Sequence, residues 1–133
     1  YHRSAEQGYP WAQCNLGYCY QNGIGIERND QLGAHWYHQA ALQGHARAQH
    51  NYGYCLQNGA GVERNLAEAL RWYRLSAEQH NQFAYHSLGY CYQHGVGVAR
   101  DDQEAVQWYR KSAELKHPPA QLSLGFCYRH GLG

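Results

Sequence analysis

The sequence predicts an all-α fold, a right-handed α/α solenoid of 36-residue helix-turn-helix repeats with three complete repeats and two partial ones. The stretch LGYCYQNGIG begins at Leu16, and nearly the same ten residues recur from Tyr52, Leu88 and Leu124. A Trp-Tyr pair keeps the same interval, beginning at Trp36, Trp72 and Trp108. A fixed period of roughly 20 to 50 residues is typical of repeat proteins, in which each unit packs mainly on its neighbours.

The repeats are expected to form one array over residues 1–133. A partial repeat covers residues 1–9, three complete repeats cover about 10–45, 46–81 and 82–117, and a second partial repeat covers 118–133. Tyr1 falls in register with the tyrosine of each Trp-Tyr pair. Because both ends fall inside a repeat, we expect the chain to be a fragment of a longer protein.

The first half of each repeat is expected to be a helix that ends at a glycine. In the repeat 10–45, Ala12, Leu16, Cys19 and Tyr20 follow the spacing that marks one face of a helix. Gly23 follows, and a glycine just past a helix can adopt positive φ and satisfy the loose carbonyl groups of the last turn. The equivalent glycine pairs are Gly23 and Gly25, Gly59 and Gly61, Gly95 and Gly97, and Gly131 and Gly133.

The second half of each repeat is expected to be another helix, begun by a short polar side chain. Asn29, Asn65 and Asp101 stand where this helix should start, and such side chains accept hydrogen bonds from its first free N–H groups. Neither helix can bury its apolar side alone, so the helices of successive repeats are expected to stack. A wide buried face is expected on the second helix, as at Ala69, Leu70, Trp72, Tyr73 and Ala77.

Composition and charge indicate a folded chain and argue against two classes of partner. With 44% apolar, 14% aromatic and 16% charged residues, the composition is that of a globular rather than a disordered chain. The formal net charge of +1 is too small for the broad basic field of a nucleic-acid-binding protein. No apolar run approaches the ~20 residues that a membrane-spanning helix needs, so no membrane insertion is expected.

The cysteines and histidines form no recognisable metal or catalytic motif. A cysteine recurs at the position of Cys19 in each later repeat, at Cys55, Cys91 and Cys127. Helices of successive repeats lie about 10 Å apart, which is too far for a disulfide between these cysteines. We therefore expect buried, reduced thiols and a cytoplasmic protein. His35 and His38 could share a metal by their spacing, but no further ligand completes the pair. The sequence predicts no metal, no cofactor and no catalytic site, so the chain is not expected to be an enzyme.

The recurrent residues resemble the Sel-1-like repeat (SLR) family, a relative of the tetratricopeptide repeat. The resemblance rests on Ala12, Leu16-Gly17, Tyr20 and Gly23-x-Gly25, followed in the second helix by Trp-Tyr and Ala-Ala, and it covers essentially the whole chain. It implies an α/α solenoid that serves as an adaptor for other proteins. One departure concerns local geometry rather than the fold: His80 and Lys116 replace the glycine that ends other second helices, at Gly8 and Gly44.

The same resemblance implies that the first helix of each repeat lines a concave face and binds a partner there. One ladder of exposed side chains is expected at Tyr18, Tyr54, Tyr90 and Phe126, and a second at Cys14, His50, His86 and Leu122. The candidate partner-binding residues are Tyr18, Gln21, Asn22, Arg47, His50, Tyr54, Gln57, Asn58, His86, Tyr90, Gln93, His94, Phe126, Arg129 and His130. Aromatic rings suit stacking on a peptide, and amide side chains suit hydrogen bonds to its backbone. In the alternative, which stays open, the aromatic ladder only packs between repeats.

The sequence therefore predicts a scaffold that binds a protein or peptide partner, without catalysis of its own. One alternative is a regulatory or targeting domain attached to an enzyme elsewhere in a longer chain, and another is a spacer without a partner. The identity of the partner and the oligomeric state stay open. Because His50, His86, His94 and His130 fall on the expected surface, we expect an acidic peptide to bind more tightly near pH 5.5 than near pH 7.5.

Overall fold

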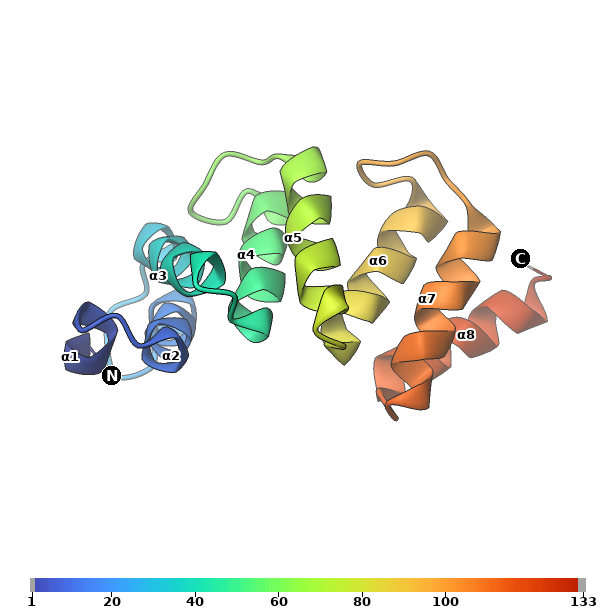
Figure 1. Ribbon diagram of the computed structural model, residues 1–133. Helices are drawn as coiled ribbons and strands as arrows, with labels where there is room; N and C mark the ends of the chain where they lie inside the picture. Colours follow the sequence, from blue (N-terminus) through green and yellow to red (C-terminus); the bar gives the residue numbers. More distant parts are fainter. Residues whose placement is uncertain (1, 132–133) are drawn as a thin grey trace. The chain divides into compact units, whose positions relative to one another are not determined.

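The computed structural model describes residues 2–131, which form α-helices joined by turns and include no β-strand (Figure 1). The helices are α1 (His2–Glu6), α2 (Pro10–Asn22), α3 (Asp30–Leu42), α4 (Ala46–Asn58), α5 (Leu66–Glu78), α6 (Gln82–His94), α7 (Asp102–Glu114) and α8 (Pro118–Arg129). The chain divides into a first unit, Tyr1–Trp72, and a second unit, Tyr73–Gly133. The predicted all-α architecture is confirmed. Tyr1 and Gly133, two residues of the expected register, lie outside the described residues.

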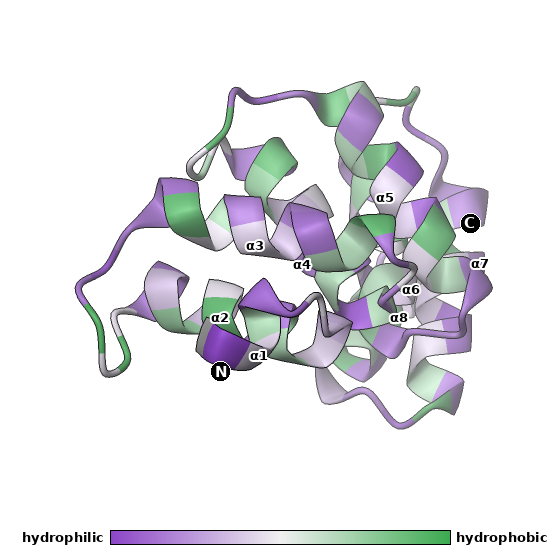
Figure 2. Cartoon of the chain, turned by 60° about the vertical axis from the view of Figure 1, so that its left-hand side comes forward, coloured by the Kyte–Doolittle hydropathy of each residue, from purple (hydrophilic) through white to green (hydrophobic). Residues whose placement is uncertain are grey.

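Consecutive helices pack on each other within each unit. In the first unit α2 packs on α3 and α3 on α4, and in the second unit α6 packs on α7 and α7 on α8. The longer helices carry both hydrophobic and hydrophilic residues, as expected for helices with one covered side (Figure 2). The predicted buried face of the second helix is confirmed in α5, where the buried residues include Ala69, Leu70, Trp72, Tyr73 and Ala77.

A close contact in the pairs α2–α3 and α6–α7 places a tyrosine ring on a glycine. A Cβ atom added to Gly17 of α2 would lie 2.8 Å from Cδ1 of Tyr37 in α3. One added to Gly89 of α6 would lie 2.6 Å from Cδ1 of Tyr109 in α7. Real Cβ atoms do not come this close to another side chain, so only glycine lets these helices approach. Both rings are fully buried and fill the space between the paired helices.

Each of these tyrosines also donates a hydrogen bond to the helix on which it packs. The Tyr37 hydroxyl donates to Gln21 Oε1 at 3.0 Å, and the Tyr109 hydroxyl donates to Gln93 Oε1 at 2.6 Å. A buried phenol needs such a partner, because an unpaired polar group in a core costs about 1 to 3 kcal/mol. Burial raises the pKa of both tyrosines, so the hydroxyls stay protonated and act as donors at physiological pH.

The predicted capping residues and turn glycines are confirmed. Oδ1 of Asn29, Asn65 and Asp101 each accepts a hydrogen bond of 3.1 Å from the backbone N–H three residues later. The glycines that follow the first helices have positive φ, at 66° for Gly23, 68° for Gly59 and 67° for Gly95. These local signals fix where the helices of each repeat begin and end.

The turn after the second helix keeps a left-handed residue even where glycine is replaced. Gly8 and Gly44 have φ of 90° and 87°, and His80 and Lys116 take φ of 61° and 60° at the equivalent positions. A residue with a Cβ adopts this conformation at a cost of roughly 1 to 2 kcal/mol. The replacements therefore make the turn less favourable but preserve its direction.

The cysteines are core residues, with one exception. Cys14, Cys55, Cys91 and Cys127 are buried, and all the cysteines of the described residues are free thiols. Burial raises the pKa of Cys14 to about 11 and that of Cys55 to about 12, so the unreactive thiol form dominates at neutral pH. Cys19, on α2, is only half-buried.

Burial lowers the pKa of several partly or fully covered histidines below the ordinary value of 6.5. They are His38, His45, His86 and His117. In the second unit the His86 and His117 rings lie 5.5 Å apart between centroids, and a charge on His117 lowers the pKa of His86 further. His117 also packs on Phe83, with 4.8 Å between ring centroids. A proton on either ring would thus be poorly solvated.

Gly89→Ala should destabilise the chain, whereas Gly125→Ala should not. The added methyl group at position 89 would overlap the buried Tyr109 ring, and overpacking of this kind costs about 1 to 3 kcal/mol. Nothing lies within 4 Å of a Cβ placed on Gly125, the residue of α8 at the same repeat position. Alanine there should stabilise the helix by about 0.5 to 1 kcal/mol. Urea unfolding measures both changes, and equal stability of the two variants would contradict the tight contact between Gly89 and Tyr109.

The free energy of unfolding should fall as the pH is lowered from about 7.5 to about 5.5. Because burial lowers the pKa of His38, His45, His86 and His117 in the folded state, the unfolded chain binds more protons once the pH drops through the ordinary value of 6.5. Carboxylates titrate mainly below this range, so the loss reports on the histidines. Urea unfolding at both pH values measures the loss, which should be smaller in His117→Gln. A stability that stays constant or rises on acidification would show that these imidazoles are solvated.

Candidate partner-binding surface

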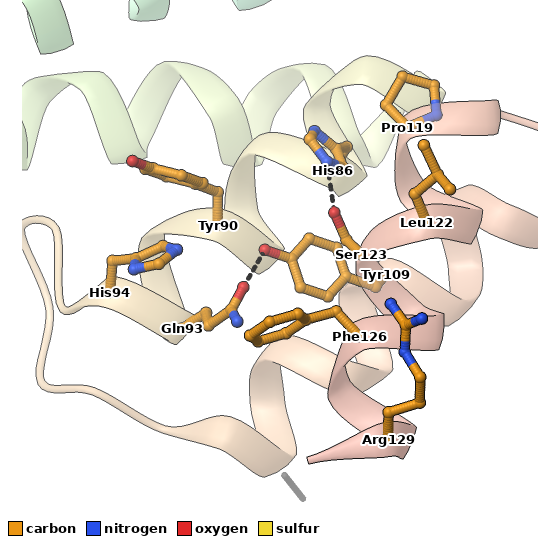
Figure 3. A pocket seen from close by; sticks show the side chains of 10 residues that line it. All are labelled: His86, Tyr90, Gln93, His94, Tyr109, Pro119, Leu122, Ser123, Phe126 and Arg129. Atoms are coloured by element: carbon orange, nitrogen blue, oxygen red, sulfur yellow. Dashed lines mark hydrogen bonds between the residues drawn. The ribbon is translucent and has the colours of Figure 1, made fainter.

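A groove of about 610 Å³ lies between α6 and α8 in the second unit, with the ring of Tyr109 from α7 between the two helices (Figure 3). We call it the α6–α8 groove. Its lining residues are His86, Tyr90, Gln93 and His94 from α6, Tyr109 from α7, and Pro119, Leu122, Ser123, Phe126 and Arg129 from α8.

Two side-chain hydrogen bonds connect the three helices at the groove. His86 Nε2 lies 3.2 Å from Ser123 Oγ and links α6 to α8, while the hydroxyl of Tyr109 donates to Gln93 Oε1 and links α7 to α6 (Figure 3). Because Gln93 uses its oxygen for Tyr109, its amide N–H groups are the part left to bind a ligand. Burial, assisted by the nearby His117, lowers the pKa of His86, so this ring is neutral at physiological pH.

Aromatic rings on α6 and α8 pack against imidazoles four residues further along the chain. The ring centroids of Tyr90 and His94 are 4.3 Å apart, and those of Phe126 and His130 are 4.1 Å apart. These contacts leave much of each ring open to solvent, since Tyr90 is 44% exposed and Phe126 is 43% exposed. The groove therefore presents aromatic surface that a partner can cover.

The candidate residues of the first unit lie on two helices. Those on α2 are Tyr18, Gln21 and Asn22, and those on α4 are Arg47, His50, Tyr54, Gln57 and Asn58. The guanidinium carbon of Arg47 lies 5.7 Å from the centroid of the Tyr18 ring, and Arg47 Nη1 donates to Asn15 Oδ1 at 3.2 Å. Asn22 and Asn58 each donate to the backbone oxygen four residues earlier, at 3.0 Å. Several of these groups thus already make bonds within their own unit.

The candidate residues of the second unit lie close together. Six of them line the α6–α8 groove, and these are His86, Tyr90, Gln93, His94, Phe126 and Arg129. His130 lies in an adjoining depression of about 470 Å³ with Arg100. Sequence reasoning missed Tyr109, Pro119 and Ser123. The recurrence of Tyr109 in the Trp-Tyr register marks it as structurally important, whereas the roles of Pro119 and Ser123 depend on how α8 packs, which the repeat pattern does not specify.

One expected ladder position is wrong. Cys14 is fully buried, so it does not form an exposed ladder with His50, His86 and Leu122. Asn51 of α4 hydrogen-bonds the Cys14 side chain, and the charge of Arg47 acts on it as well, which shows that α4 covers this side of α2. Leu122, by contrast, is 76% exposed and lines the groove.

No three histidine, cysteine or acidic side chains within residues 2–131 lie together in a way that could hold a metal ion. Nor does this range contain a helix with the length and apolar character needed to cross a bilayer.

The chain is similar to known repeat proteins along most of its length. A family model described as Sel1 repeat matches residues 12–45, 46–81, 82–117 and 118–133. The structure of c5321, a protective antigen present in uropathogenic Escherichia coli strains and displaying an SLR fold, is 41% identical and matches 99% of this chain with a TM-score of 0.93. A Sel1 repeat protein from Oxalobacter formigenes is 40% identical and matches 96% of this chain with a TM-score of 0.86.

A more distant structure shares the fold alone. Helicobacter pylori cysteine rich protein B is 23% identical, with a TM-score of 0.70 over 89% of this chain and 90% of its own. The chain spans 28% of the length of the c5321 structure and 51% of that of the Oxalobacter formigenes protein. No curated protein matches the sequence.

Sel1 repeat proteins are α/α solenoids that generally act as protein-interaction scaffolds, and the fold is typically non-catalytic. The four matched segments together extend from residue 12 to residue 133, which is most of the chain. The helix pairs, the glycine turns and the likeness to solved relatives all agree with the α/α solenoid that the sequence predicts. The chain therefore belongs to the Sel1 repeat family.

Proposed function

We propose that the chain is a binding scaffold whose α6–α8 groove holds an extended segment of a partner protein, without catalysis of its own. The groove itself is the observation that supports this function most directly. It combines a volume of about 610 Å³ with exposed aromatic rings and several polar side chains. Pockets that recognise peptides typically pair apolar surface with a few hydrogen-bonding groups, because the first gives affinity and the second fixes orientation.

The polar groups of the groove suit a peptide backbone. Gln93 offers amide N–H donors, Arg129 offers guanidinium donors, and both lie at the edge of aromatic surface (Figure 3). Tyr90 and Phe126 stand on opposite helices and can cover the two sides of a bound chain. An extended segment can therefore gain both apolar contact and main-chain hydrogen bonds in the groove.

The first unit carries a separate candidate surface of its own. Tyr18 and Tyr54 are about as exposed as Tyr90 and Phe126, and Arg47 covers part of the Tyr18 ring. Because Arg47 and the Asn22 and Asn58 amides already bind within the unit, we place the main contacts on the α6–α8 groove.

A second role is compatible with this one. Since the chain spans only 28% and 51% of two relatives, a longer protein can use the same groove to recruit a partner to an enzyme domain. The binding activity of this chain is the same in both roles, so the test below applies to either.

Phe126→Ala should weaken peptide binding, whereas Tyr128→Ala should not. Random linear peptides displayed on phage are selected on the full chain, and the affinity of synthetic copies is measured by fluorescence polarisation. Loss of the Phe126 ring should lower affinity about tenfold or more, because aromatic residues at the centre of an interface carry much of its energy. Tyr128 lies on the same helix and is also exposed, but it does not line the groove, and its hydroxyl accepts a bond from Arg110 Nη2 at 3.0 Å.

Thermal unfolding of both variants establishes that they are folded. Peptides that bind the two variants equally well, or a selection that yields no binder at all, would show that the α6–α8 groove is not a peptide-binding site.

A further inference from the structure

The α6–α8 groove contains basic side chains and no acidic one among its lining residues. Arg129 contributes a guanidinium group, and His86 and His94 add imidazoles, of which that of His86 is neutral at physiological pH. The adjoining depression contributes Arg100 and His130, again without an Asp or Glu in its lining. The two depressions share part of their walls, so they form a surface complementary to a negatively charged ligand.

Arg129 and Arg100 differ in their partners. Nε and Nη2 of Arg100 donate to the two carboxylate oxygens of Asp102, at 3.2 and 3.3 Å, so the charge of Arg100 is largely matched within the chain. Arg129 forms no ion pair within residues 2–131. A guanidinium group offers five N–H donors and binds a carboxylate through two parallel hydrogen bonds. Arg129 is thus the groove residue best suited to receive a carboxylate.

Apolar residues lie beside Arg129 on the same side of α8. Phe126 precedes Arg129 by three residues and Leu122 precedes Phe126 by four, a spacing that places side chains on one face of a helix. Figure 3 shows all three side chains on the groove side of α8. The 76% exposure of Leu122 leaves a large apolar side chain without cover. A ligand that meets Arg129 can therefore also bury apolar surface on Leu122 and Phe126.

The equivalent helix of the first unit shows what is particular to α8. Counting two repeats back, Pro119 and Arg129 of α8 correspond to Arg47 and Gln57 of α4. The cation of α4 is Arg47, which already has partners within its own unit. Its guanidinium group lies over the Tyr18 ring and donates a hydrogen bond to Asn15. In α8 the cation is Arg129, which lies at the C-terminal end of the helix and lines the groove.

We propose that the segment bound in the α6–α8 groove carries an Asp or Glu side chain close to a large apolar residue. The carboxylate accepts hydrogen bonds from Arg129, and the apolar side chain covers Leu122 and Phe126. The proposal rests on the function proposed above and adds the chemical class of the partner.

The test uses the phage-selected peptides on the full chain. They should be enriched in Asp or Glu near Leu, Ile, Phe or Trp. Affinity should fall about tenfold or more in Arg129→Glu, since a hydrogen-bonded charge pair is replaced by repulsion. Arg110→Glu makes the same charge change on an exposed residue of α7 that does not line the groove, and the affinity of this variant should stay within about twofold of wild type. Replacing the acidic residue of the peptide by Lys should restore binding to Arg129→Glu.

The possible failures are distinguishable. Peptides that lose affinity in Phe126→Ala but respond equally to Arg129→Glu and Arg110→Glu would overturn the acidic class and leave the peptide-binding groove standing. Selected peptides without acidic residues would also overturn the acidic class and leave the peptide-binding groove standing. Binding that is insensitive to Phe126→Ala would overturn both proposals.

Discussion

The fold depends on the contact between a buried tyrosine ring and a glycine of the neighbouring helix. Gly17 and Gly89 have no Cβ atom, and the rings of Tyr37 and Tyr109 pack against the space that a Cβ atom would fill. Glycine inside a helix costs about 1 kcal/mol relative to alanine, but burial of a large aromatic side chain contributes roughly 1.5 to 3 kcal/mol. The tyrosine hydroxyl then finds an amide oxygen on the same helix as the glycine. This contact accounts for the glycine of the Leu-Gly motif and the tyrosine of the Trp-Tyr motif in the two helix pairs α2–α3 and α6–α7.

The same contact shapes the candidate binding surface. Tyr109 packs α7 against α6, and it is also the residue that α7 contributes to the lining of the α6–α8 groove. Its bond to Gln93 occupies the amide oxygen of that side chain and leaves the amide N–H groups as donors. Core packing and the proposed partner recognition therefore share residues, whereas the charge of the groove comes from positions such as Arg129 that the core does not need.

The sequence was sufficient to predict the structural features that depend on local chemistry. The cap at Asn29 and the turn at Gly23 follow from the hydrogen-bonding and conformational preferences of single residues, and both are found where they are expected. Periodicity, however, identifies equivalent positions without showing which side of a helix is covered. Cys14 occupies a ladder position but is buried by α4, while Pro119 lines the groove because of the way α8 packs. Features of this kind depend on contacts between helices, and the repeat period does not specify those contacts.

Amide NMR spectra of the full chain, recorded while a selected peptide is added, test the central claim most directly. If the peptide occupies the α6–α8 groove, the largest chemical-shift changes belong to groove residues of α6 and α8, such as Tyr90, Gln93, Phe126 and Arg129. The exposed side of α7, at Arg110 and Lys111, shows little change. Shifts that are largest at these α7 positions, with α6 and α8 unaffected, would contradict a binding site built on the contact between Gly89 and Tyr109.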